Sequence, residues 1–202
     1  RFTLQLVDLH PGRITNTFVG HTSRLTGAVF TDEGRKLVST CTDQTLKVWD
    51  IARKGESLPI SGHEYWINVI KVHGGQAYTG CQDGSFKIWN LDTAESEFSR
   101  QYDSRGVDDI QLTENGRRAA IVYTDDIQIW DLEKLKAVFL LNAASAMNLG
   151  IRAFRMPPDG RRAISHIDCM LYTELVAWDL EKGTEIARFK LEMGQSGGIA
   201  IS

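Results

Sequence analysis

The chain has 202 residues, of which 42% are hydrophobic and 24% are charged. These fractions are typical of a packed globular protein and exclude a disordered or fibrous class. The 23 basic and 26 acidic residues give a net charge of −3 and are mixed along the chain. We therefore expect neither nucleic acid nor an anionic membrane as a partner.

The longest apolar run, residues 137–141, is far shorter than a membrane span. The chain opens without a basic segment followed by an apolar one, which is the pattern of a secretory signal. The three cysteines cannot all pair within the chain. We therefore expect an intracellular, cytoplasmic protein.

In chain order, residues 2–7 form the first predicted strand. Between residues 20 and 61, four β-rich segments follow, at 25–31, 36–40, 46–49 and 57–60. Glycine, aspartate and asparagine separate them at intervals of roughly eight to twelve residues, which is typical of short strands joined by tight turns. The segment therefore predicts an antiparallel β-meander.

The third strand of this meander recurs along the chain, each time ending in tryptophan and an acidic or amide residue. The four pairs are Trp49-Asp50, Trp89-Asn90, Trp130-Asp131 and Trp178-Asp179. Successive tryptophans are 40, 41 and 48 residues apart. A period of this length predicts stacked copies of one supersecondary unit, because a lone unit cannot bury both faces of its sheet.

These residues resemble the WD40-repeat β-propellers. The resemblance is carried by Gly20-His21 and Gly62-His63, each followed by a turn aspartate and a Trp-Asp or Trp-Asn pair. It implies a buried hydrogen-bond network in each of these two units. The matching residues are His21, Ser39, Asp43, Trp49, His63, Thr79, Asp83 and Trp89. Cys41 and Cys81 occupy equivalent positions, which explains their spacing without a disulfide or a metal.

The later units depart from this pattern. The third has Ile121 where the hydroxyl should be, and neither the third nor the fourth has a Gly-His pair. We therefore expect that these units cannot form the network. The fourth unit is longer, and we expect enlarged loops at residues 143–150 and 168–174. His166 and Cys169 are then interpreted as parts of a solvated loop, and a metal site formed with Asp168 is the alternative.

The predicted fold is an all-β WD40 propeller segment with four complete four-stranded blades and a partial blade at each end. The expected units are 1–19, 20–61, 62–101, 102–142, 143–193 and 194–202 within one partial propeller. The family's usual ring has seven blades, so the chain is interpreted as part of a larger ring. A five-bladed ring whose two ends share a blade is the alternative.

The functional prediction is a non-catalytic protein-interaction scaffold, or a regulatory sensor segment of a larger protein. Its partners would be other proteins or other domains of the same chain. No catalytic, metal or cofactor residues are assigned. By resemblance, the divergent blades are similar to those of large proteins in which WD40 arrays follow a nucleotide-switch domain. The alternatives are an enzyme whose active site is completed outside the segment and a purely architectural subunit.

The resemblance also implies that the loops before each first strand share one rim with the turns between second and third strands. The predicted partner surface on this rim comprises Arg24, Thr42, Tyr65, Gln82, Arg105, Met147, Met170 and Tyr172. For Trp66, core packing is favoured over partner contact. For Met147 and Met170, filling a gap above the fourth blade is an equal alternative.

Overall fold

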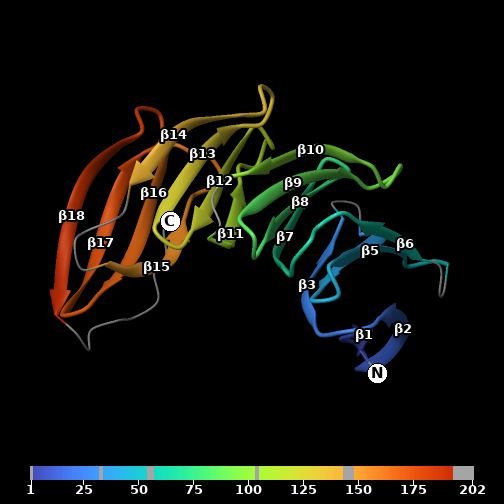
Figure 1. Ribbon diagram of the computed structural model, residues 1–202. Coiled ribbons are helices and arrows are strands. Elements are labelled where there is room, and N and C mark those ends of the chain that lie inside the picture. The colour runs from blue at the N-terminus through green and yellow to red at the C-terminus, as the bar shows by residue number, and fades with distance from the viewer. Residues whose placement is uncertain (1, 32–33, 54–56, 103–104, 143–147, 193–202) are drawn as a thin grey trace. The chain divides into compact units, whose positions relative to one another are not determined.

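The structure is a computed structural model that describes residues 2–31, 34–53, 57–102, 105–142 and 148–192. The chain divides into two compact units, Arg1–Gly106 and Val107–Ser202. Every regular element in the described ranges is a β-strand (Figure 1), which confirms the all-β prediction. Those ranges contain no helix with the length and hydrophobicity needed to cross a bilayer.

The first unit contains three antiparallel sheets. Sheet A consists of β1 (Phe2–Asp8) and β2 (Arg13–His21). Sheet B consists of β3 (Leu25–Phe30), β4 (Lys36–Cys41), β5 (Thr45–Asp50) and β6 (Ser57–Ser61). Sheet C consists of β7 (Ile67–His73), β8 (Gln76–Cys81), β9 (Ser85–Asn90) and β10 (Ser96–Gln101).

The second unit contains two antiparallel sheets. Sheet D consists of β11 (Val107–Leu112), β12 (Arg118–Tyr123), β13 (Asp126–Asp131) and β14 (Lys136–Asn142). Sheet E consists of β15 (Asn148–Arg155), β16 (Arg162–Cys169), β17 (Tyr172–Asp179) and β18 (Thr184–Glu192). In each four-stranded sheet the strands lie side by side in chain order, as in the blades of a β-propeller.

The acidic or amide residue after each tryptophan shapes the turn between third and fourth strands. Asp50 Oδ1 accepts hydrogen bonds from the backbone N–H groups of Ala52, at 2.9 Å, and Arg53, at 3.1 Å. Asn90 and Asp179 bind the equivalent N–H groups of their own turns. An Asp or Asn side chain that captures nearby backbone donors in this way favours a turn over further strand. In each recurring pair, the tryptophan therefore packs in the core and the residue after it forms the turn.

In the first unit, the tryptophans of sheets B and C pack each of these sheets against the sheet before it. Trp49 of sheet B is buried with Phe18 of sheet A, their ring centroids 5.4 Å apart. Trp89 of sheet C belongs to a cluster with Val38 and Leu46 of sheet B. Both clusters lie within the first unit. Sheets that bury apolar residues face to face in this way account for strands that are hydrophobic on both sides.

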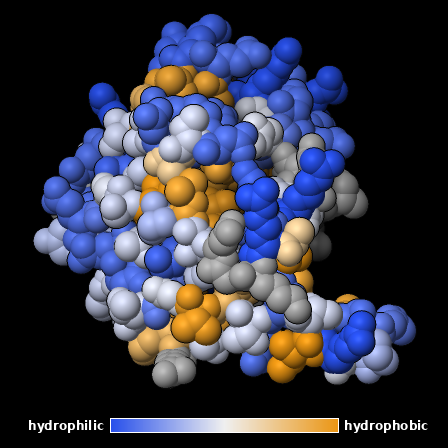
Figure 2. Space-filling view, turned by 90° about the vertical axis from the view of Figure 1, so that its right-hand side faces the viewer, coloured by the Kyte–Doolittle hydropathy of each residue, from blue (hydrophilic) through white to orange (hydrophobic). Residues whose placement is uncertain are grey.

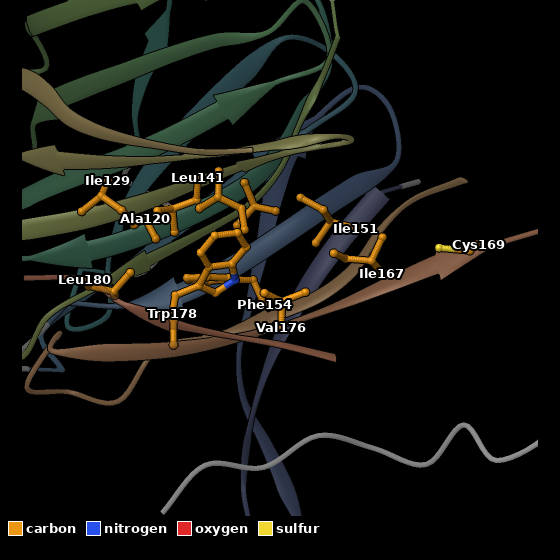
Figure 3. Packing of buried hydrophobic residues seen from close by; sticks show 13 residues of the cluster. Ala120, Ile129, Leu141, Ile151, Phe154, Ile167, Cys169, Val176, Trp178 and Leu180 are labelled. Atoms are coloured by element: carbon orange, nitrogen blue, oxygen red, sulfur yellow. The ribbon is translucent and has the colours of Figure 1, made fainter. Parts of the chain in front are cut away.

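The second unit repeats this arrangement between sheets D and E. Figure 3 shows Trp178 of sheet E surrounded by apolar side chains of both sheets, including Ala120 and Leu141 of sheet D and Phe154 of β15. Trp178 and Phe154 are almost completely buried. Removing an aromatic ring from such a site costs about 3–5 kcal/mol, so this cluster dominates the packing of the two sheets.

The extra residues of the fourth unit lie in its strands. The strands β16 and β17 each have eight residues, whereas the equivalent strands of the other sheets have six. Only Met170 and Leu171 separate them. The prediction of an enlarged loop at 168–174 was therefore wrong, because the added residues continue the antiparallel pairing. The second predicted loop, 143–150, lies mostly outside the described residues.

Candidate functional site

The four residues of the predicted network in the first repeat form a continuous series of hydrogen bonds within sheet B. The Trp49 indole N–H donates to Ser39 Oγ at 2.8 Å, and Ser39 Oγ lies 2.8 Å from His21 Nε2. The other ring nitrogen, His21 Nδ1, lies 3.0 Å from Asp43 Oδ2. Since the carboxylate can only accept, His21 donates from Nδ1 and accepts the Ser39 hydroxyl proton at Nε2. The Trp49 indole N–H, the Ser39 hydroxyl and both His21 ring nitrogens thus all have hydrogen-bond partners.

The Asp43 carboxylate accepts further hydrogen bonds at the surface end of this network. It accepts from the Thr45 hydroxyl at 2.6 Å and from the Thr22 backbone N–H at 2.9 Å. Burial acts to raise the pKa of Asp43, but the hydrogen bonds from Thr45, Thr22 and His21 outweigh it and hold that pKa well below its ordinary value. Asp43 therefore stays charged and fixes the His21 ring.

Sheet C contains the same indole–hydroxyl–imidazole series with a different last link. The Trp89 indole N–H donates to Thr79 Oγ1 at 2.7 Å, and Thr79 Oγ1 lies 2.8 Å from His63 Nε2. His63 Nδ1 contacts Ser85 Oγ at 3.1 Å, and Asp83 accepts from the Ser85 backbone N–H at 2.8 Å. Among the described residues, Ser85 thus takes the place next to the ring that the sequence analysis gave to Asp83.

The environment of His63 disfavours its charged form. Burial is the main cause, the positive charge of Lys87 adds to it, and Asp83 opposes it; together they lower the pKa of His63 to about 4. Lys87 lies over the Trp89 ring, with its Nζ 5.8 Å from the ring centroid, and donates to the Gly62 carbonyl. A neutral His63 can accept the Thr79 proton and donate to Ser85.

In sheets D and E the tryptophan N–H still has an acceptor. Trp178 Nε1 donates to Ser165 Oγ at 2.9 Å, through the same strand positions as in sheet B. Trp130 Nε1 donates to Gln128 Oε1 at 2.9 Å. The sequence pattern places the hydroxyl position at Ile121, whereas the acceptor is Gln128, two residues before the tryptophan on the same strand. A buried polar side chain at that position was the available signal.

Two clusters of metal-ligand types coincide with the networks, His21 with Cys41 and Asp43, and His63 with Cys81 and Asp83. The nearest ligand atoms of each cluster lie within 4.8 Å of one another. However, both nitrogens of each imidazole are already hydrogen-bonded to protein groups. Burial raises the pKa of both thiols, which opposes the thiolate form that binds metals. The hydrogen bonds account for these residues, and a metal would have to displace them.

His166 and Cys169 were wrongly placed in a solvated loop by the sequence analysis. Both are buried in β16, because the lengthened strand takes up the residues assigned to the loop. His166 Nε2 has no hydrogen-bond partner among the described residues, and Asp168 Oδ1 lies 3.6 Å away. Figure 3 shows Cys169 on its strand beyond Ile167 and away from Trp178.

Five predicted partner-surface residues lie in the first unit. The backbone joins them in two places, since the Thr42 N–H donates to the Arg24 carbonyl at 2.9 Å and the Gln82 N–H to the Trp66 carbonyl at 2.8 Å. A Cβ atom added at Gly106, next to Arg105, would lie 3.3 Å from the Gln82 backbone, so this loop passes close to the turn of sheet C. Each loop before a first strand is thus held beside a turn between second and third strands.

Exposure differs among these residues. Tyr65 is 57% exposed, Arg24 and Gln82 are also exposed, and Thr42 and Arg105 are half-buried. Trp66 is 56% exposed, so the prediction that it packs in the core was wrong. Two adjacent exposed aromatic side chains therefore stand at this end of sheet C, on a loop whose backbone is fixed by Gln82.

The remaining three predicted residues belong to the second unit. Met170 is 62% exposed and does not fill a gap above the blade. Tyr172 is half-buried, with Lys190 Nζ 4.5 Å from the centroid of its ring. Met147 lies outside the described residues. Met170 thus lies in the short turn between β16 and β17, and Tyr172 is the first residue after it.

The family model described as WD domain, G-beta repeat matches residues 12–50 and 56–90. Autophagy-related protein 16 of Arabidopsis thaliana is 26% identical over 91% of this chain and 36% of its own length. The serine-threonine kinase receptor-associated protein of Gallus gallus is 26% identical over 72% of this chain and 41% of its own length.

COMPASS component SWD3 of Saccharomyces cerevisiae is 22% identical over 64% of this chain and 45% of its own length. The chain thus spans less than half the length of each of these relatives. The family model matches the two units that contain complete hydrogen-bond networks, and sheets D and E repeat the same strand order and tryptophan packing. Residues 12–50 and 56–90 thus match the repeat of the WD40 family directly, and the chain as a whole is similar to WD40-repeat proteins.

Proposed function

We propose that the chain is a non-catalytic interaction segment of a larger protein and binds a protein partner, or another domain of its own polypeptide, through the loop ends of its blades. The observation that carries this proposal is the exposure of Tyr65 and Trp66 on a loop whose backbone is fixed. Aromatic side chains presented on a rigid base are enriched among the residues that dominate binding energy at protein interfaces.

The blades have separate structural and exposed residues, which supports this role. The polar groups of the two networks are hydrogen-bonded to one another and hold the blade, and their titratable members are buried or half-buried. The loops before the first strands carry the exposed side chains. A scaffold that fixes variable surface loops in this way is suited to recognition. The names of two relatives, a COMPASS component and a receptor-associated protein, also describe proteins that associate with others.

The test uses the full-length protein in cells, with proximity labelling to quantify associated proteins. Arg24→Glu, Tyr65→Ala and Trp66→Ala should each reduce labelling of the same partner at least fivefold. These side chains are exposed, so the melting temperature should change by less than about 2 °C. The matched control is Glu95→Lys, an exposed charge change in the turn between β9 and β10, which should have no effect. Loss of the partner with Glu95→Lys alone would contradict the proposed surface.

A further inference from the structure

The hairpin between β16 and β17 projects farther than the equivalent hairpins of sheets B and C. The residue that accepts the tryptophan N–H gives a common reference, Ser39 in sheet B and Ser165 in sheet E. From this residue the second strand continues to Cys41 in sheet B, two positions later, and to Cys169 in sheet E, four positions later. Two extra paired residues extend the hairpin by about 7 Å.

The chemistry at the tip of this hairpin is also different. The turns of sheets B and C contain Asp43 and Asp83, which bind backbone or side-chain donors. In sheet E the tip consists of Met170 and Leu171, which are 62% and 70% exposed. Leu149, at the start of the neighbouring β15, is 60% exposed, and the pairing of Asn148 with Cys169 places it at the same end of the sheet. These residues form an exposed apolar patch, a feature that marks interaction sites.

The base of the hairpin is braced on both sides. Arg152 of β15 contacts Asp168 at 3.2 Å. On the other side, Lys190 of β18 lies over the Tyr172 ring and 3.8 Å from Glu174. Glu174 is buried and is also paired with Arg188. The apolar tip is thus presented by a fixed support, which lowers the entropy lost on binding.

We propose that Met170 and Leu171, with Leu149 beside them, insert into a concave apolar pocket of a protein partner. A convex apolar tip requires a concave apolar surface to exclude water from both sides. The charges around the hairpin do not favour an anionic lipid surface, because the described positive and negative side chains balance. The cations are Arg152, Arg188 and Lys190, and the anions are Asp168, Glu174 and Glu192. Stable membrane attachment by so small an apolar tip would need a polybasic surplus as a second signal.

This inference rests on the proposed function and specifies the partner's chemistry. The experiment replaces Leu171 by the photo-crosslinker p-benzoylphenylalanine in the full-length protein, with the same substitution at Lys182 as control. Lys182 is exposed and belongs to the turn at the other end of sheet E. We expect a cross-link to a protein from position 171 only, mapping to apolar residues of a pocket. Binding of that purified partner should then weaken at least tenfold with Leu171→Asp and less than threefold with Leu171→Met.

Four outcomes would overturn the inference: no cross-link from position 171, a cross-link to lipid, a cross-link to a second copy of this chain, or equal cross-linking from position 182. Equal affinities of Leu171→Asp and the unmodified protein would overturn it too. Tyr65→Ala separates the two proposals. If Tyr65→Ala weakens partner binding while Leu171→Asp does not, the hairpin inference fails and the proposed function stands. If neither weakens binding, both fail.

Discussion

At the scale of single residues, the indole N–H of each repeated tryptophan has an acceptor, but the acceptor changes from sheet to sheet. It is a serine hydroxyl in sheets B and E, a threonine hydroxyl in sheet C and the Gln128 carbonyl in sheet D. A buried indole without an acceptor costs about 1–3 kcal/mol, so the requirement is for an acceptor rather than for one residue type. Among the described residues, an imidazole contacts the accepting hydroxyl in sheets B and C.

Asp43→Ala should lower the free energy of unfolding by about 1–3 kcal/mol, because the buried His21 loses its acceptor. The same change at Asp125 should cost clearly less, since the third repeat has no histidine at the position of His21. Urea melts of the full-length protein measure both values. Equal losses at the two positions would contradict the assignment of Asp43 to the network.

The pH dependence of stability should reveal His63. Its pKa in the folded protein is about 4, whereas the unfolded value is near 6.5. The unfolded chain therefore binds the proton more tightly between these values, and stability falls as the pH falls from 6.5 to 4. Through His63, the free energy of unfolding is therefore higher above pH 6.5 than below pH 4, by at most about 3 kcal/mol.

The control for this prediction is His63→Asn. Urea melts at pH 7.5 and 4.5 should show a smaller acid-induced loss of stability for the variant than for the unmodified protein. An equal loss would show that His63 is not the group responsible, because the remaining titratable residues are the same in both proteins.

At the scale of elements, the acceptor of the tryptophan N–H lies on the second strand in sheets B, C and E but on the third strand in sheet D. Gln128 and Lys47 occupy equivalent positions, two residues before their tryptophans. Gln128→Leu should destabilise sheet D by about 1–3 kcal/mol, because Trp130 loses its acceptor. Lys47→Leu should cost much less, since Trp49 keeps Ser39. Hydrogen exchange of the amides in each sheet measures the local effect, and similar losses at both positions would contradict this account.

Much of the architecture was predictable because the Trp-Asp period and the glycine and aspartate turns are local signals. The direct partner of His63 was not, because Asp83 and Ser85 lie two residues apart and only the side-chain packing selects between them. The extension of β16 was missed for a related reason. Met170 and Leu171 form a turn without glycine, asparagine or aspartate, so a continuing hairpin and an irregular loop look alike in sequence.

At the scale of the molecule, apolar surface stays uncovered on sheets A and E. In Figure 2 hydrophobic side chains lie near the lower end of the view, at the level of β1 and β2 in Figure 1. Exposed residues of β2 include Ile14 and Val19, and those of β18 include Ile186 and Phe189. Such faces are covered in a stack of repeats by neighbouring sheets. They are the faces at which the predicted larger ring would continue.

Residues 1–202 expressed alone should therefore bind a hydrophobic dye and form oligomers or aggregates. Dye fluorescence and light scattering of the isolated chain, compared with the full-length protein, check this expectation. Phe189→Lys, which removes one of the exposed apolar side chains, should reduce both signals. A monodisperse monomer that melts cooperatively and binds no dye would contradict it.

The packing of Trp49, Trp89 and Trp178 onto the preceding sheet has a consequence for biosynthesis. Trp49 reaches back to sheet A and Trp89 to sheet B, and in the second unit Trp178 reaches back to sheet D. During translation the earlier sheet leaves the ribosome first. When each of these three tryptophans is made, the sheet against which it packs has therefore already been synthesised. Each of them can be buried before the next sheet emerges.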